Sequence, residues 1–170
     1  MSPRVVIVGM PASGKSTVGH EVAAALGIPF RDADDVIEAR SGKLIREIFS
    51  DDGEEAFRAI EEVVVLESLG ADDCVVSLGG GAVLSPTIRA ALVGLPVVWL
   101  EVGVATATRR AGLNQLRPLL LGDVRARMET LLAERSHLYD EVATIRLNTD
   151  RVSTAELVGQ IVAALEVSAR

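Results

Sequence analysis

The feature that most constrains the fold is a glycine-rich loop that lies between a predicted strand and a predicted helix. Residues 4–8 read Arg-Val-Val-Ile-Val, a largely β-branched run typical of a buried strand. Val18, Val22 and Leu26 then recur at helical spacing. Residues 9–16 connect the two elements with the sequence Gly-Met-Pro-Ala-Ser-Gly-Lys-Ser. The chain therefore begins with a strand, a glycine loop and a helix.

This loop matches the pattern G-x-x-x-x-G-K-[ST], which is typical of a nucleotide phosphate-binding loop. Its glycines let main-chain amides turn toward the phosphates, and the helix N-terminus adds its positive end. We expect Lys15 to reach the transferred phosphoryl group and Ser16 to bind Mg²⁺. A chance glycine turn is the alternative, but every fixed position of the pattern is filled. The other expected contacts to ATP come from Ala12, Ser13, Gly14 and Thr17.

The rest of the chain alternates between strand and helix patterns. Helices are predicted within residues 34–69 with breaks at 41–42 and 52–53, then near 104–110, up to about 139, and after a capping box formed by Ser153 and Glu156. Strands separated by helices predict a three-layer α/β domain with a five-stranded parallel sheet. The further strands are expected at 28–31, 75–78, 97–100 and 145–148.

The composition limits the possible partners. With 170 residues the chain fits one domain, and 49% hydrophobic but only 3% aromatic residues suit strands buried beneath helices. A formal net charge of −7 argues against a nucleic-acid partner, because such proteins usually carry a basic stripe. No apolar stretch reaches the roughly 20 residues that cross a membrane. The single Cys74 lies in an apolar run typical of a buried thiol. We expect a cytoplasmic monomer.

Candidate residues for binding a second substrate follow the second and third predicted strands. Asp32 and Asp34 come after one strand, and the glycines at 79–81 come after the other. Ligands of open α/β sheets bind at the carboxyl ends of the strands, so these residues and the glycine loop should face one crevice. The aspartates could order Mg²⁺-bound water and meet an acceptor hydroxyl, or could cap a helix. Three glycines permit close contact between a ligand and the backbone, or form a flexible turn.

Taken together, these segments closely resemble the shikimate kinase family over essentially the whole chain. The resemblance is carried by the phosphate-binding loop, Asp32-Ala33-Asp34, Ile48-Phe49 through Gly53-Glu54 to Phe57-Arg58 and Glu61, residues 78–82, Arg117-Pro118-Leu119-Leu120, and Arg135 with Tyr139. It implies transfer of the γ-phosphoryl group of MgATP to the 3-hydroxyl of shikimate. It also implies a fold of the nucleoside-monophosphate kinase group, in which residues 33–61 bind shikimate and residues 112–122 form a lid.

The resemblance further implies a role for each matching residue. Asp34 would bond the acceptor hydroxyl and take its proton, while Arg58 and Arg135 would grip the carboxylate. Lys15 and Arg117 would neutralise the transferred phosphoryl group. The remaining implied roles are Mg²⁺ ligation by Ser16, Mg²⁺ binding through water by Asp32, ring contacts from Gly79, Gly80 and Gly81, apolar walls from Phe49 and Phe57, and orientation of Arg58 by Glu61.

Several alternatives remain open from the sequence. Arg58, taken alone, is equally typical of a surface arginine on an acidic helix. A gluconate kinase would share the phosphate-binding loop and the overall shape, and a nucleotide-binding module without catalysis would share the fold. Residues 149–154 lack the proline and the basic character that the family commonly carries near adenine. Arg110 and Arg151 are therefore only candidates for flanking the base.

Overall fold

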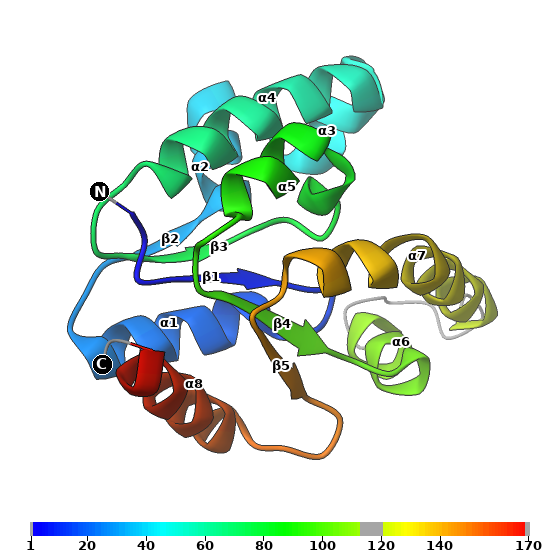
Figure 1. The fold of residues 1–170 in the computed structure, drawn as a ribbon. Coiled ribbons are helices and arrows are strands. Elements are labelled where there is room, and N and C mark those ends of the chain that lie inside the picture. The colour runs from blue at the N-terminus through cyan, green and yellow to red at the C-terminus, as the bar shows by residue number, and fades with distance from the viewer. Residues whose placement is uncertain (1, 113–120, 169–170) are drawn as a thin grey trace.

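A computed structural model describes residues 2–112 and 121–168, which form a five-stranded sheet covered by helices on both faces (Figure 1). Every strand pair is parallel, and the strand order is β2-β3-β1-β4-β5. The predicted α/β class and parallel sheet are therefore confirmed. The strands are β1 (Val5–Val8), β2 (Phe30–Asp32), β3 (Val75–Ser77), β4 (Val97–Glu101) and β5 (Ile145–Asn148).

The helices follow the predicted order, with one addition. They are α1 (Lys15–Leu26), α2 (Ala33–Ser41), α3 (Ile45–Asp51), α4 (Gly53–Leu69), α5 (Pro86–Leu92), α6 (Val104–Gly112), α7 (Leu121–Val142) and α8 (Thr154–Ser168), with a 3-10 turn η1 (Ala82–Leu84). Helix α5 was not predicted, although the sequence Ser85-Pro86 is a typical helix start. In the structure Ser85 caps the helix by accepting a hydrogen bond from the Ile88 amide, and Pro86 occupies the first helical position.

The buried central strand β1 divides the core into two layers. Val6 and Val8 belong to a cluster with side chains of α2, α4, α5 and α7, whereas Val5 and Ile7 belong to a cluster with α1 and α8. All four side chains are at most 1% exposed. Because successive strand residues point to opposite faces, this short apolar run can anchor both helical layers at once. The loop that follows β1 is thereby fixed in the middle of the sheet.

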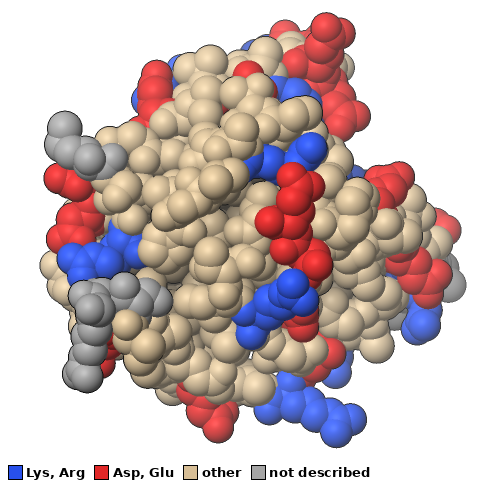
Figure 2. Space-filling view, viewed as in Figure 1, with Lys and Arg blue, Asp and Glu red and all other residues tan. Residues whose placement is uncertain are grey.

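The surface carries charges of both signs. On the face shown in Figure 2, lysine and arginine side chains lie between aspartate and glutamate side chains. Cys74 is buried, as its apolar surroundings predicted. Within residues 2–112 and 121–168, no helix combines the length and the apolar character that crossing a membrane requires.

Candidate active site

The phosphate-binding loop leads from β1 into α1 through a constrained backbone. Gly14 caps the helix with a φ of 88°, and Ala12 also has a positive φ of 63°. Positive φ values suit glycine but are uncommon for alanine, so the loop holds local strain of the kind found at functional sites. The buried Ser13 hydroxyl has no hydrogen-bond partner among the described residues. The loop therefore presents unsatisfied polar groups beside the start of a helix.

Lys15 is folded back over this loop, where its Nζ donates to the Met10 carbonyl oxygen at 2.8 Å. Burial lowers the pKa of Lys15 to about 8, although the carboxylates of Asp34 and Asp32 act in the opposite direction. The ammonium group is thus only weakly solvated. A charge in such surroundings interacts more strongly with an incoming anion than one in bulk water.

Asp32 connects the loop to the neighbouring strand. One carboxylate oxygen accepts from the Asp34 amide at 2.9 Å and caps α2, as the capping alternative predicted. The other oxygen accepts from the Ser16 hydroxyl at 2.6 Å. This pair of oxygen ligands fits Mg²⁺, which usually takes one or two protein oxygens besides water and substrate phosphates. No cluster of three or more His, Cys, Asp or Glu residues suited to a metal occurs in the described part of the chain.

Asp34 lines the crevice and has other acidic groups as neighbours. Burial, followed by the nearby charges of Asp32 and Glu61, raises the pKa of Asp34 to about 6, although Lys15 acts in the opposite direction. A carboxyl group with a pKa near neutrality can be ionised at physiological pH and still accept a proton efficiently. These properties are those of a general base.

The three glycines after β3 provide space for side chains of the site. None of them has a positive φ, so a turn does not require glycine there. A Cβ at Gly79 would lie 2.8 Å from Asp34 Oδ1, and a Cβ at Gly81 would collide with the guanidinium of Arg58. Any other residue at these positions would displace a charged group. The structure thus gives a reason for glycine at these two positions, the room taken by Asp34 and Arg58, and close contact with a ligand stays a prediction.

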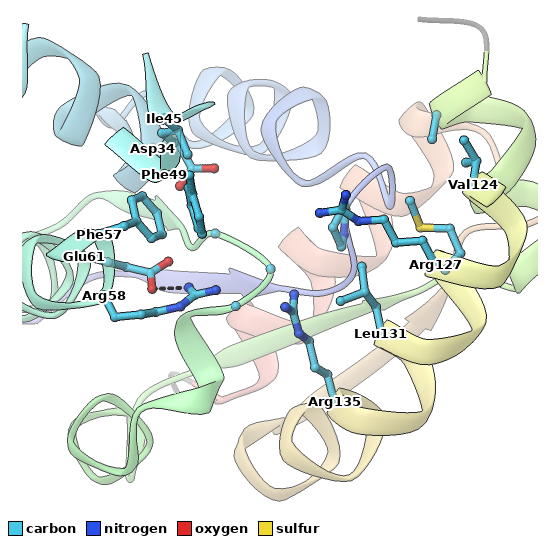
Figure 3. A pocket seen from close by; sticks show the side chains of 16 residues that line it. Asp34, Ile45, Phe49, Phe57, Arg58, Glu61, Val124, Arg127, Leu131 and Arg135 are labelled. Carbon is cyan, nitrogen blue, oxygen red and sulfur yellow. Dashed lines mark hydrogen bonds and ion pairs between the residues drawn. The ribbon is translucent and has the colours of Figure 1, made fainter. Parts of the chain in front are cut away.

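A cavity of about 390 Å³ lies between the phosphate-binding loop, the α2–α4 segment, the glycines and α7 (Figure 3). Its apolar wall includes Phe49 and Phe57, whose ring centroids are 4.6 Å apart. Its charged residues are Asp34, Arg58, Glu61, Arg127 and Arg135. The cavity thus combines a flat apolar wall with a few convergent charges, which is typical of a small-molecule site.

Arg58 is held within this cavity and is not a free surface arginine. Its Nη1 donates to Glu61 Oε2 at 2.5 Å, and its guanidinium lies 5.2 Å from the Phe57 ring centroid. Glu61 is 2% exposed. Burial raises the pKa of Glu61, although the bond from Arg58 opposes this effect. Arg58 Nη2 also donates to the exposed Glu54 at 3.4 Å, a long bond, whereas the buried Nε has no partner among the described residues. The acidic neighbours therefore orient the guanidinium and leave part of its donor set to an anion.

Arg135 enters the cavity from α7, opposite Arg58 (Figure 3). Its buried Nε has no hydrogen-bond partner among the described residues. One turn later, the hydroxyl of the fully buried Tyr139 donates to the Gly80 carbonyl oxygen at 2.6 Å. The Tyr139 ring also packs against Trp99. Tyr139 thus connects the helix that carries Arg135 to the glycine segment.

Part of this wall was not predicted from the sequence. Val124, Arg127, Met128 and Leu131 of α7 also line the cavity. Their spacing to Arg135 places them on one side of a helix, so the signal was available once α7 was known to extend this far. The predicted lid arginine, Arg117, lies outside the described residues.

A second cavity of about 340 Å³ adjoins the other side of the phosphate-binding loop. Of the predicted ATP contacts, Ala12, Ser13, Gly14 and Thr17 line it, together with Arg110, whereas Arg151 does not. Arg110 donates to the Thr149 carbonyl oxygen at 3.1 Å and to the Ala12 carbonyl oxygen at 3.2 Å. This cavity is placed where a nucleoside would continue from phosphates bound by the loop.

Comparison with known proteins points to one family. The family model described as shikimate kinase matches residues 11–166. A protein from Mycobacterium avium named shikimate kinase is 51% identical over 97% of this chain and 94% of its own length. The solved structure of shikimate kinase from Acinetobacter baumannii in complex with shikimate has a TM-score of 0.90 at 32% identity, covering 99% of this chain and 94% of that one. A gluconokinase from Sinorhizobium meliloti superposes less well, with a TM-score of 0.64 at 25% identity over 96% and 91% of the two chains.

The raised pKa of Asp34 predicts that this residue lowers stability at neutral pH. The folded value of about 6 exceeds the ordinary 3.8. The protonated carboxyl of Asp34 therefore contributes to folding stability fully below pH 3.8. This contribution, at most about 3 kcal/mol, is lost as the pH rises through 6. We expect Asp34→Asn to unfold at a higher temperature than the original protein at pH 8, and both to converge near pH 3.5. A gain of equal size at both pH values would contradict this assignment.

The Tyr139 hydroxyl is expected to hold the glycine segment in place. Tyr139→Phe keeps the ring but leaves the Gly80 carbonyl oxygen without its donor, which should cost about 1–3 kcal/mol of unfolding free energy. Amide exchange at Ala82 and Leu84, whose amides bond Gly79 and Gly81, should accelerate locally. Ser68→Ala is the control, because it removes a buried hydrogen bond within α4. Equal exchange rates at these amides in the two variants would refute the role of Tyr139.

Proposed function

The chain belongs to the shikimate kinase family, and we propose that the crevice described above transfers the γ-phosphoryl group of ATP to the 3-hydroxyl of shikimate. The enzyme is thus an ATP-dependent kinase that acts in the route to chorismate. One observation carries the assignment of the site. A single cavity beside the phosphate-binding loop holds two opposed guanidinium groups together with a carboxyl group whose pKa is about 6.

The two guanidinium groups would bind the carboxylate of shikimate. Guanidinium is planar and permanently charged, and it donates two parallel hydrogen bonds to a carboxylate. Arg58 is oriented for this task by Glu61, and Arg135 faces it from α7. The apolar wall of Phe49 and Phe57 would contact the ring, and Gly79, Gly80 and Gly81 would let the ring approach the backbone. A rigid cyclic acid fits this combination.

Asp34 would bind the acceptor hydroxyl and take its proton. At a pH above about 6 the carboxylate is ionised and can accept a hydrogen bond from the hydroxyl. As the oxygen attacks the γ-phosphorus, its proton passes to Asp34, and the bond between the γ-phosphorus and the bridging oxygen of ADP breaks. The protein contributes mainly positioning and charge neutralisation, because phosphoryl transfer requires little covalent chemistry from it.

Lys15 and the loop amides would hold the β- and γ-phosphates, with Ala12, Ser13, Gly14 and Thr17 contributing the remaining contacts. Ser16 would ligate Mg²⁺, and Asp32 would hold it through water. Held by these two residues, Mg²⁺ would supply positive charge to offset that of the phosphates. Lys15 would exchange its bond to the Met10 carbonyl oxygen for one to phosphate.

Three further parts of the proposal rest on the sequence. Residues 33–61, which span α2, α3 and the start of α4, would form the shikimate-binding insertion. Residues 112–122 would form a lid whose Arg117 contacts the transferred group and whose closure excludes water. The negative net charge and the absence of a long apolar stretch in the sequence favour a cytoplasmic monomer without a nucleic-acid or membrane partner.

A coupled assay of ADP release with MgATP tests the substrate. We expect release that depends on shikimate and no comparable release with gluconate or nucleoside monophosphates. The gluconokinase resemblance makes gluconate the most informative competitor. Release that depends on gluconate and is indifferent to shikimate would overturn the proposal. Release with no acceptor at all would indicate simple ATP hydrolysis.

Arg58→Lys tests the carboxylate site, because it keeps the charge and loses the planar fork. Loss of one partner of a buried charge pair typically costs about 2–5 kcal/mol, so shikimate should bind at least about tenfold more weakly. ATP affinity should change little, and calorimetric titration of each ligand measures both effects. Arg40→Lys is the matched control, because Arg40 forms an exposed ion pair with Glu67. Equal losses for shikimate and ATP would show that Arg58 has only a structural role.

A further inference from the structure

Arg127 places a cation in the acceptor cavity, in addition to the arginines that the sequence singled out. Arg127, Leu131 and Arg135 lie four residues apart on α7, and all three line the cavity. The guanidinium of Arg127 extends into the cavity from a position two turns before Arg135, whereas Arg135 lies closer to Arg58 (Figure 3). Pro11 of the phosphate-binding loop lines the same cavity. Two cationic positions therefore occupy different parts of one helical wall.

The charge of Arg127 is not compensated by the surrounding protein. Across residues 2–112 and 121–168 the exposed Arg127 forms no hydrogen bond or ion pair. Arg125, two residues earlier, shows the usual arrangement on this helix, because its Nε donates to Glu129 Oε1 at 2.9 Å. Arg58 is likewise paired with Glu61. Arg127 therefore retains its full set of donors for a ligand.

The charges of the reaction indicate what this ligand group is. Glu61 balances Arg58, and the acceptor carboxylate balances Arg135, which leaves Asp34 and Arg127 in the cavity. Transfer then adds a phosphate monoester, which carries about −1.5 to −2 charges at pH 7. This group forms beside Asp34, whose carboxyl already lies among acidic neighbours. A cation on the cavity wall facing the loop would stabilise such a product, in addition to Lys15.

We propose that Arg127 binds the transferred phosphoryl group and so retains the phosphorylated product in the acceptor cavity. The proposal rests on the proposed function, and it deepens that function by assigning the phosphate of the product to α7. Arg127 donates from the cavity wall, whereas Lys15 donates from the phosphate-binding loop. Because a bond to phosphate forms only with the product, Arg127 should discriminate between shikimate and its 3-phosphate.

Titration of both ligands tests this inference. We expect Arg127→Gln to bind shikimate 3-phosphate about tenfold more weakly and to bind shikimate within about twofold of the original protein. The deficit should shrink as salt is added, because the lost interaction is electrostatic and exposed. Arg125→Gln is the control, since it removes an equal charge from the same helix without touching the cavity. Its affinity for both ligands should remain unchanged.

The alternative outcomes separate this inference from the proposed function. An equal loss of affinity for both ligands, or an equal effect of Arg125→Gln, would show that Arg127 contributes only general positive charge. Unchanged affinity for the 3-phosphate would show that Arg127 faces solvent in the complex. Either result overturns the role of Arg127 and leaves the proposed function intact. If the original protein bound neither ligand, the proposed function would fail and this inference would fail with it.

Discussion

The site depends on the parallel hydrogen bonding of β1, β3 and β2, which fixes where each strand ends. Ile7 and Asp32 both pair with Ser77, so the three strands reach the same row of the sheet. Beyond this row the chain continues into the phosphate-binding loop, Asp34 and the three glycines. β1 and β3 are buried on both faces and have little freedom to slip, because a slip by one residue would turn every apolar side chain to the opposite layer. Core packing thereby sets the relative positions of the charged groups.

This placement has an electrostatic consequence. Lys15 and Asp34 are brought into the same poorly solvated crevice, where burial destabilises both charged forms and shifts their pKa values toward neutrality from opposite sides. Each also stabilises the charge of the other. A ligand that brings phosphate to the lysine and a hydroxyl to the carboxylate replaces part of the lost solvation. The unliganded crevice is thus preorganised for the charges of the reaction at some cost in stability.

The sequence was sufficient to predict the sheet, the phosphate-binding loop and the residues around Asp34, because their signals are local. Strand patterns and glycine breaks identify elements, and the rule for carboxyl ends of strands brings them together. The α7 wall was harder to predict. Arg127 and Leu131 resemble ordinary residues of a polar helix, and only the packing of α7 against η1 and β4 shows which side faces the cavity. For the same reason, spacing alone could not separate Arg110, which lines the second cavity, from Arg151, which does not.

The bond between Tyr139 and Gly80 gives α7 a fixed point close to its carboxyl end. From Tyr139 the helix extends back by 18 residues to Leu121, or roughly 27 Å, but by only about 6 Å to Arg135. Arg135 thus lies close to the fixed point, and the beginning of the helix lies far from it. A tilt of about 5° around Tyr139 would displace the beginning of the helix by roughly 2 Å and Arg135 by only about 0.5 Å. A small tilt of α7 would thus leave Arg135 nearly in place while the residues at the beginning of the helix move.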